Sequence, residues 1–327
     1  MREGMKKWRD KVLDGGALSR LEALDLVEAP LEELCRAADE VRRNFCQEKF
    51  DICTIINGKS GRCPENCKYC AQSVHHHTET EEYPLLSQEE MLKAALWNQD
   101  AGVLRFSVVT SGRRLSQGEV DQVCAAFRLL KKETQLSLCA SHGLLDYEQY
   151  RQLREAGVER IHNNLETSRR YFPHICTTHT YEDKRAAIQA AQKAGLSVCS
   201  GGIMGMGETW EDRIDLALDL RELSITSIPI NVLHAVPGTP LEGLPPLKLP
   251  EIRRIVAIYR MIHPSAAIRM AGGRGQLPDK GRSVFTSGAN AAISGPMLTT
   301  SGISMEEDMK ILQELGYKAA LLDTKEA

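Results

Sequence analysis

The sequence predicts an α/β protein built as a closed (β/α)8 TIM barrel. Eight short segments rich in β-branched and apolar residues recur along the chain, and a helical pattern follows each of them. Repeated strand-helix alternation of this kind is typical of a parallel barrel. The length of 327 residues fits a barrel of about 250 residues with an extension at each end. An open doubly wound sheet is the alternative, but no GxGxxG follows the first predicted strand.

The predicted elements begin with a helical N-terminal extension, residues 1–48. Apolar residues recur there at helical spacing from Leu21 to Val41, with a break near Pro30. Residues 49–296 form the barrel. Its eight predicted strands read DICTII, VLRFSVV, LSLCAS, ERIHNNL, LSVCSGGI, SIPINVL, AIRMAG and ANAAIS.

Capping residues mark the starts of helices between and after these strands. Ser87 precedes QEEMLKAALWNQ, and Thr180 precedes YEDKRAAIQAAQKA. Residues 297–327 form a short C-terminal extension, in which Ser304 begins one further helix and Gly316 ends it.

Composition narrows the class of partner. The 41 basic and 44 acidic residues leave a formal net charge of -3, so we expect neither a nucleic-acid nor a membrane partner, and small molecules are favoured as ligands. No run of about 18 apolar residues occurs, and the N-terminal MREGMKKWRD lacks the apolar core of a signal peptide. We therefore expect a cytoplasmic protein, in which the ten cysteines remain reduced.

The loop SGRCPENCKYCAQS directly follows the first predicted strand and contains Cys63, Cys67 and Cys70. Loops at this end of a barrel build its active site. A structural zinc site would need a fourth Cys or His, and no second CxxC occurs. His75 to His77 are close in sequence, but the acidic flank TETEEYP favours a solvated loop. Three thiolates would leave one iron of a 4Fe-4S cluster open to a substrate.

This CxxxCxxC loop resembles that of radical S-adenosylmethionine enzymes. The resemblance implies that Cys63, Cys67 and Cys70 hold a 4Fe-4S cluster whose open iron binds the amino and carboxylate groups of S-adenosylmethionine. An electron from the cluster then cleaves the sulfonium and yields a 5'-deoxyadenosyl radical. Burial and hydrogen bonds to sulfur are the means by which a protein tunes such a cluster.

Further segments resemble the biotin synthase family. In chain order they read CPENCKYCAQS, HNNLETS, VCSGGIMGMGET, PINVLHAVPGTPL and IRMAGGR, and the resemblance runs from about residue 17 to residue 318. It implies a sulfurtransferase that converts dethiobiotin to biotin with sulfur from an auxiliary iron-sulfur cluster, either 2Fe-2S or a larger variant. It also implies flavodoxin or ferredoxin as electron donor, cluster-assembly machinery as a partner, and a homodimer.

The resemblance also points to the ligands of the auxiliary cluster. Cys139, Cys199 and Arg269, on the third, fifth and seventh predicted strands, match ligands of the family. Ser107 stands where the family usually has a cysteine, and Cys53 stands where many members have a serine that faces the same cavity. We expect Cys53 to restore a set of three cysteines and one arginine. The alternatives are an enzyme that has lost the cluster and uses another sulfur source, or buried cysteines that only fill the core.

Contacts to the two small molecules are implied in the same way. Those to S-adenosylmethionine are assigned to Tyr69, Glu166, Gly201, Ile203 and Glu208. Those to dethiobiotin are assigned to His162, Asn164 and Asn231. A carboxylate accepts from a ribose diol, and an amide offers the donor and the acceptor that a cyclic urea requires. For the glycine-rich GGIMGMGE, a simple strand-to-helix turn is the alternative.

Two further expectations remain open at this stage. Alternation along the fourth predicted strand places His162, Asn164 and Glu166 on one face and Asn163 on the other. Cys176, in HICTTHTY, is either an extra thiolate of the site or an ordinary loop cysteine. The alternative functions are another radical S-adenosylmethionine barrel enzyme, such as a hydrogenase-maturation relative, and a metal-binding structural or sensor protein.

Overall fold

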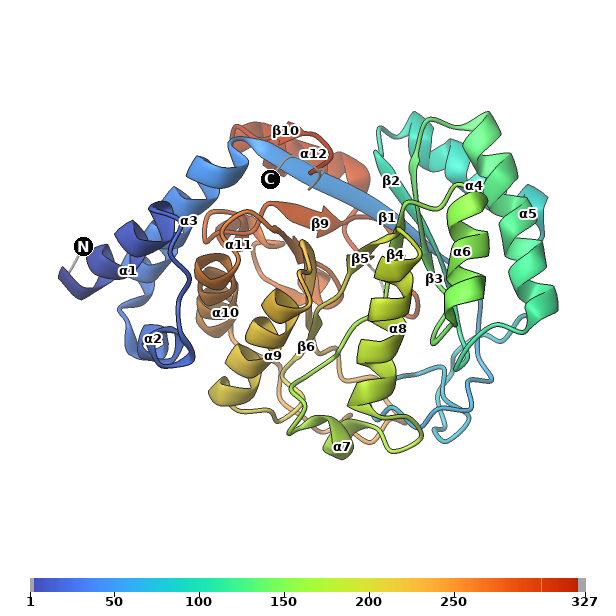
Figure 1. Cartoon of the computed structure of the whole chain (residues 1–327), viewed down its shortest axis with the longest axis horizontal. Coiled ribbons are helices and arrows are strands. Elements are labelled where there is room, and N and C mark those ends of the chain that lie inside the picture. Colours follow the sequence, from blue (N-terminus) through green and yellow to red (C-terminus); the bar gives the residue numbers. More distant parts are fainter. Residues whose placement is uncertain (1–2, 301, 323–327) are drawn as a thin grey trace.

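The computed structural model describes residues 3–300 and 302–322 and confirms the predicted (β/α)8 barrel (Figure 1). The predicted extensions include residues 1–2, 301 and 323–327, which lie outside the described residues. The strands are β1 (Lys49–Lys59), β2 (Arg105–Thr110), β3 (Ser137–Ser141), β4 (Arg160–His162), β5 (Ser197–Cys199), β6 (Gly202–Met204), β7 (Ser227–Val232), β8 (Ala267–Met270), β9 (Ala291–Ile293) and β10 (Lys318–Ala319).

Parallel pairing joins the strands from β1 to β9 in sequence order, except that β5 and β6 both pair with β7, and β9 returns to β1 to close the barrel. Each of the eight predicted strand segments contains a strand, and the fifth divides into β5 and β6. The division lies opposite Pro229 of β7, which has no N–H to offer the ladder. A Cβ at Gly201, between the two short strands, would lie 1.9 Å from the carbonyl oxygen of Pro229. Glycine is therefore required at that position.

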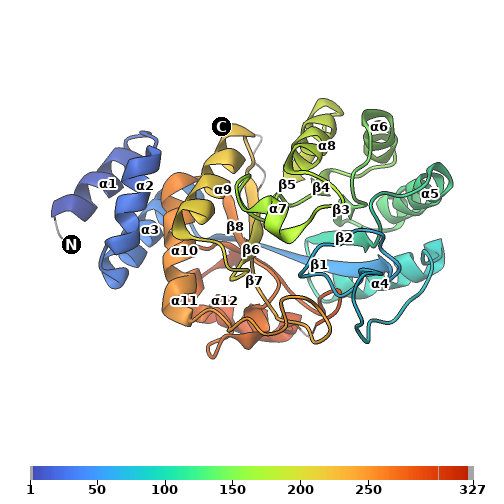
Figure 2. The same ribbon diagram turned by 90° about the horizontal axis from the view of Figure 1, so that it is seen from below.

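Helices surround the barrel, as Figures 1 and 2 show from two directions. They are α4 (Gln88–Asp100), α5 (Gln117–Glu133), α6 (Tyr147–Glu155), α7 (Phe172–Ile175), α8 (Tyr181–Lys193), α9 (Trp210–Glu222), α10 (Leu249–Ile262), η2 (Arg274–Gln276) and α11 (Arg282–Phe285). The predicted caps Ser87 and Thr180 each complete a capping box. Within residues 3–300 and 302–322, every helix is too short or too polar to cross a bilayer.

The N-terminal segment is helical and packs on one side of the barrel, at the left in Figure 1. It contains α1 (Glu3–Leu13), α2 (Arg20–Asp25), η1 (Leu26–Glu28) and α3 (Leu31–Cys46). The predicted break at Pro30 is the N-cap position of α3. Helix α3 packs against α10, and α2 packs against α9.

The C-terminal segment is held by a buried ion pair. Helix α12 (Met305–Glu314) begins at its predicted cap Ser304, and β10 then pairs with the start of β1. Arg274 donates from both terminal nitrogens to the carboxylate of Asp308, each at 2.6 Å. Ser294, which follows β9, also donates to Asp308. The segment that follows the barrel is thereby tied to its last strand.

A buried carboxylate lies in the barrel interior among three arginines. Asp51 of β1 is fully buried, and its Oδ1 lies 2.9 Å from Nη2 of Arg269. Its Oδ2 lies 3.6 Å from Nη2 of Arg105. Burial alone would raise the pKa of Asp51, but Arg269, Arg105 and Arg160 outweigh it and hold the pKa below its ordinary value. Asp51 is therefore ionised and compensates positive charge inside the barrel.

Asp51→Asn removes this compensation and leaves buried guanidinium groups without their carboxylate. We expect a loss of about 3 kcal/mol or more in the free energy of unfolding at neutral pH. The folded pKa lies below the unfolded value of about 3.9, so the stabilisation is present above that pH and is lost as the pH falls toward the folded pKa. Urea unfolding of anaerobically purified protein, followed by circular dichroism over a pH series, measures both effects.

The matched control is Asp100→Asn, at the exposed end of α4, which we expect to change the unfolding free energy by less than about 0.5 kcal/mol. If Asp51→Asn behaves like this control, the assigned charge balance is wrong.

Candidate active site

One cavity of about 390 Å³ runs from inward-facing strand positions to the loops that follow β1, β2, β7 and β8. Twelve of the predicted site residues line it, namely Cys53, Cys63, Tyr69, Cys70, Cys139, His162, Asn164, Glu166, Cys199, Ile203, Asn231 and Arg269. The other three, Cys67, Gly201 and Glu208, are not among the described residues that line the cavity. The cavity thus joins the cysteine loop to cysteines inside the barrel.

The cysteine loop is shaped by backbone bonds at its base. It begins at two left-handed residues, Gly61 (φ 76°) and Arg62 (φ 50°). The N–H of Cys63 then donates to the carbonyl oxygen of Gln72 at 3.0 Å, and the N–H of Val74 donates back to Cys63 at 2.9 Å. The Gln72 side chain accepts from the N–H of Gly61. These bonds close the loop into a compact turn at the C-terminal end of β1.

Two of the three consecutive histidines bind the backbone of this loop. A ring nitrogen of His75 lies 3.1 Å from the carbonyl oxygen of Pro64, and one of His76 lies 3.0 Å from that of Cys67. The prediction of a solvated segment agrees with the exposure of His75 and His77. The contacts to carbonyl groups add a structural role that the run of histidines does not indicate.

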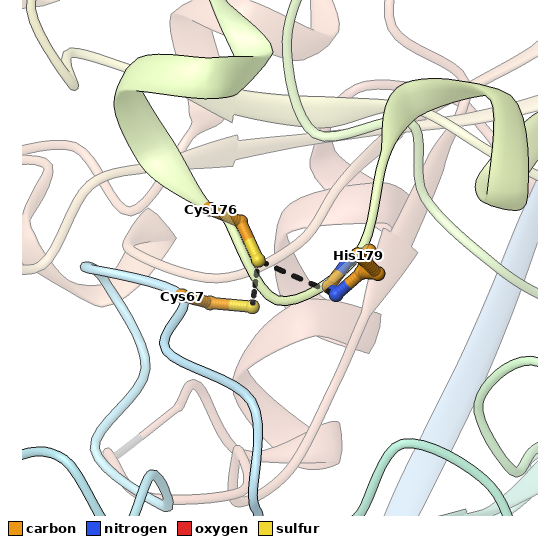
Figure 3. Close-up of side chains that lie close together, drawn as sticks. All are labelled: Cys67, Cys176 and His179. Atoms are coloured by element: carbon orange, nitrogen blue, oxygen red, sulfur yellow. Dashed lines mark hydrogen bonds between the residues drawn. The ribbon is translucent and has the colours of Figure 1, made fainter.

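The three loop thiols point in different directions. Cys63 and Cys70 face the cavity, whereas Cys67 is buried and turns toward Cys176, which directly follows α7 (Figure 3). The two Sγ atoms lie 3.6 Å apart, and Nδ1 of His179 lies 3.3 Å from the Sγ of Cys176. Cys176 is thus a neighbour of the cysteine loop rather than an isolated loop residue.

The cysteine loop fits a 4Fe-4S cluster in donor type and position. Three thiols lie within one short segment, and two of them face the large cavity. Burial raises the pKa of Cys63, and it raises the pKa of Cys70 to about 11. These thiols therefore keep their protons until a metal displaces them.

The barrel interior presents a second group of thiols, each beside a hydrogen-bond donor. Nη1 of Arg269 lies 3.2 Å from the Sγ of Cys53, and Nη1 of Arg105 lies 3.8 Å from the Sγ of Cys139. The hydroxyl of Ser227 donates to the Sγ of Cys199 at 3.2 Å. Donors of this kind stabilise thiolate ligands, so this group fits an iron-sulfur cluster.

Ser107 faces the same space. It is the direct partner of Cys139 in the β2–β3 ladder and lines the cavity. Its hydroxyl oxygen is buried and has no hydrogen-bond partner among the described residues. A buried hydroxyl is rarely left unpaired in a folded protein, so this oxygen is suited to contact a group bound in the cavity.

His162 lies against Cys199 of the neighbouring strand. The two residues are partners in the β4–β5 ladder. Burial would raise the pKa of Cys199, but its hydrogen bond with His162 and the positive charges of Arg269 and Arg160 outweigh burial and lower the pKa to about 6. Cys199 is therefore the most acidic of the three interior thiols.

The alternation predicted beyond His162 is wrong. Strand β4 ends at His162, and Glu166 adopts a left-handed conformation with φ 71°. Asn163 therefore lines the cavity together with His162, Asn164 and Glu166. The amide of Asn164 donates to Glu166 at 3.3 Å and accepts from the N–H of Gly201 at 3.0 Å. The turn after β4 places the predicted contact residues Asn164 and Glu166 at the cavity.

The glycine-rich segment after β5 is organised by a buried glutamate. Glu208 accepts from the N–H groups of Gly205 and Met206 at 2.8 and 2.7 Å, and from Nε of Arg213 at 2.7 Å. Ile203, by contrast, lines the cavity. Glu208 shapes this loop from behind the cavity.

Asn231 is held by the backbone of two neighbouring strands. Its Oδ1 accepts from the N–H of Gly272 at 2.9 Å, and its Nδ2 donates to the carbonyl oxygen of Gly202 at 3.2 Å. These bonds fix the orientation of the amide at the cavity wall.

Several cavity residues are absent from the sequence-based assignment. Arg105 and Arg160 line the cavity beside the thiols, and so does Lys184. The signal that indicates Arg269, an arginine between apolar residues in a predicted strand, is also present at Arg105 between Leu104 and Phe106. No comparable local signal exists for Lys184, which comes from the surrounding helix α8.

Comparison with known families and structures agrees with the resemblance seen in the sequence. Residues 59–220 match the model of the Radical SAM superfamily, and residues 229–318 match the Biotin and Thiamin Synthesis associated domain. A methylornithine synthase superposes with a TM-score of 0.83 at 19% identity, covering 96% of this chain and 98% of that one. The FeFe-hydrogenase maturase of Carboxydothermus hydrogenoformans gives 0.81 at 15% identity, covering 97% and 79%. These structural likenesses show the fold alone.

Curated relatives are far more similar in sequence. The biotin synthase of Brachyspira hyodysenteriae is 57% identical over 96% of this chain and 94% of its own length. That of Akkermansia muciniphila is 55% identical over 95% and 97%, and that of Clostridium botulinum strain Hall is 51% identical over 95% and 98%. The chain therefore belongs to the biotin synthase family of the radical S-adenosylmethionine superfamily.

Proposed function

We propose that this chain converts dethiobiotin to biotin by radical sulfur insertion. The observation that carries the proposal is the single cavity that joins loop thiols Cys63 and Cys70 to interior thiols Cys53, Cys139 and Cys199. Family membership implies a 4Fe-4S cluster, S-adenosylmethionine and an auxiliary iron-sulfur cluster as cofactors. A radical generator and a sulfur source must both reach one substrate, and a shared cavity meets that requirement.

The cysteine loop holds the radical-generating cluster in this proposal, through Cys63, Cys67 and Cys70. When bound, the cluster and S-adenosylmethionine supply the 5'-deoxyadenosyl radical that abstracts hydrogen from the substrate. Cys67 must turn from Cys176 toward the cavity to join its two neighbours. A change of side-chain rotamer on a loop residue is a modest rearrangement.

Contacts to S-adenosylmethionine follow from the placement of the predicted residues. Tyr69 and Ile203 present apolar surface to the cavity, and the Glu166 carboxylate accepts from the ribose hydroxyls. Gly201 contributes through the close approach that its missing Cβ permits, and Glu208 through the loop that it shapes. Gly201 and Glu208 thus act by positioning the loop and not by direct contact with S-adenosylmethionine.

Contacts to dethiobiotin come from His162, Asn164 and Asn231. Each asparagine uses part of its hydrogen-bonding capacity on neighbouring groups, and so its orientation is fixed. Each amide retains one donor hydrogen and one lone pair for the cyclic urea. Preorganised amides of this kind favour one orientation of a small polar ring in a largely apolar cavity.

The auxiliary cluster is assigned to Cys53, Cys139, Cys199 and Arg269. The Arg269 guanidinium is held by the Asp51 carboxylate at Nη2, and its Nη1 also donates to the carbonyl oxygens of Asp51 and Ala292 at 2.9 and 3.0 Å. A guanidinium held in this way is pre-oriented toward the thiols. Cys53 supplies the third thiolate. It lies on β1, the strand that pairs with β2, which carries Ser107.

The remaining assignments belong to the same proposal. The boundaries 1–48, 49–296 and 297–327 are supported by the pattern of helices and strands. The homodimer, the flavodoxin or ferredoxin donor, and supply by cluster-assembly machinery are supported by the resemblance. A cytoplasmic location is supported by the ten cysteines, which a reducing compartment keeps available for iron. A hydrogenase-maturation activity is not favoured, because likeness to that class extends to the fold only.

Anaerobic incubation with dethiobiotin, S-adenosylmethionine and a strong reductant is expected to yield biotin and 5'-deoxyadenosine. Cys63→Ala removes a ligand of the radical-generating cluster, and we expect both products to fall to background. Chromatography with mass detection measures them. Cys124→Ala, a buried cysteine on the outer helix α5, is the matched control and retains both. Abundant 5'-deoxyadenosine without biotin in the wild type contradicts the proposal.

Cys53→Ser and Cys199→Ser are each expected to lose the auxiliary cluster, about two or more irons per chain, while keeping the 4Fe-4S cluster and cleavage of S-adenosylmethionine. The reason is that both thiols lie inside the barrel, away from the cysteine loop. Iron and sulfide analysis with Mössbauer spectra of anaerobically reconstituted protein measures the change, with Cys124→Ser as control. A wild-type spectrum of one 4Fe-4S cluster alone would refute the assigned ligand set.

A further inference from the structure

Cys67, Cys176 and His179 form a compact group of metal-ligating atoms beside the cavity. Their Sγ, Sγ and nitrogen atoms all lie within 4.8 Å of one another, and all three residues are buried (Figure 3). Cys67 comes from the cysteine loop, whereas Cys176 and His179 come from the segment between α7 and α8. Only Cys67 belongs to the ligand set proposed above.

The spacing of these atoms matches a tetrahedral metal site. A tetrahedron with metal-sulfur bonds of about 2.3 Å has sulfur-sulfur edges of about 3.8 Å. The Sγ atoms of Cys67 and Cys176 lie 3.6 Å apart. With a metal-nitrogen bond of about 2.0 Å the sulfur-nitrogen edge is about 3.5 Å, and the Sγ of Cys176 lies 3.3 Å from Nδ1 of His179. Two of the three edges therefore match, and the third, between Cys67 and His179, is at most 4.8 Å.

Glu65 lies beside His179 but outside this group of metal-ligating atoms, so a solvent molecule is left to supply the fourth vertex. Its Oε2 contacts Nδ1 of His179, and its side chain is buried. Two thiolates balance the charge of a divalent cation, and the Glu65 carboxylate adds one negative charge beside it. Arg113 lies 3.6 Å from Oε1 of Glu65, and Lys184 interacts electrostatically with Cys67 and His179. Neighbouring cations therefore offset that charge.

Hydrogen bonds join the two segments that carry the ligands. The N–H of Lys68 donates to the carbonyl oxygen of Ile175 at 3.0 Å. Oδ1 of Asn66 accepts from the N–H of Thr177 at 2.9 Å and lies 3.4 Å from the Sγ of Cys176. Support of this kind around metal ligands fixes their orientation and strengthens binding.

We propose that Cys67, Cys176 and His179 bind one divalent cation of the zinc and ferrous class, with solvent as the fourth ligand, when the 4Fe-4S cluster is absent. Two soft sulfur ligands and one imidazole select such a cation over magnesium or calcium. The proposal rests on the proposed function in one respect, because Cys67 is also assigned to the cluster. Occupation of the two sites is therefore mutually exclusive, and cluster assembly must release the mononuclear metal.

Binding involves no redox change. The two thiol protons and the proton between His179 and Glu65 pass to solvent, and the cation takes their places. No bond between heavy protein atoms forms or breaks.

The test uses Co²⁺ as the probe and cluster-free protein carrying Cys63→Ala and Cys70→Ala, which leaves Cys67 as the only thiol of the loop. Anaerobic titration followed by absorption spectroscopy is expected to show thiolate-to-cobalt charge transfer and the intense d–d bands of four-coordinate cobalt. Zn²⁺ is expected to displace Co²⁺. Adding Cys176→Ser to this background should weaken binding by at least about 100-fold, because a direct ligand is lost.

Two controls separate the outcomes. Adding Cys124→Ser instead removes a buried thiol outside the group and is expected to leave the titration unchanged. Cobalt that stays bound after Cys176→Ser is then assigned to the interior thiols. Cys176→Ser alone is expected to reconstitute a full 4Fe-4S cluster, which shows that the variant folds.

The proposal is overturned if the double variant binds no Co²⁺, if adding Cys176→Ser leaves the spectrum unchanged, or if Cys176→Ser alone loses the 4Fe-4S cluster. Failure to form biotin leaves these metal-binding results intact, so failure of this inference and failure of the proposed function are distinguishable.

Discussion

Charge balance inside the barrel is the constraint on which the candidate site depends. Asp51 is a fully buried carboxylate, and Arg269, Arg105 and Arg160 hold its pKa low. Buried guanidinium groups without a counter-charge would be costly, so the ion pair allows the barrel to keep positive charge beneath its thiols. Thiolates carry negative charge, and Arg269 beside Cys53 and Arg105 beside Cys139 stabilise them. A carboxylate in the barrel interior thereby supports the chemistry of the cavity.

Strands and loops supply cysteines of different character. Cys139 and Cys199 belong to β3 and β5, so the parallel ladder fixes their direction into the barrel. Cys67 belongs to a loop, and its direction is decided by neighbouring side chains such as Cys176. Interior thiols are thus preorganised, whereas the loop thiols depend on what they bind. Cys67 therefore has a partner outside the cavity, at Cys176.

Periodic signals account for most of what was predicted correctly. The barrel follows from repeated strand-helix elements, whereas the resemblance to the family indicates the cavity positions of Cys53, Cys139 and Arg269. Alternation failed beyond His162, because β4 ends there and Glu166 pairs with Gly202 in a left-handed conformation. That pairing joins residues distant in the chain, and so no local pattern indicates it.

The sequence by itself determined the barrel, the cysteine loop at the end of its first strand and the identity of the interior thiols. The barrel and the loop depend on spacing along the chain, and the interior thiols depend on the resemblance to the family; both are visible without coordinates. Only the tertiary structure decided that Asp51 compensates Arg105, and that Cys67 meets a thiol 109 positions away at Cys176. The reason is physical: such contacts depend on barrel closure and on the packing of one loop against another. Neither leaves a periodic trace in the sequence.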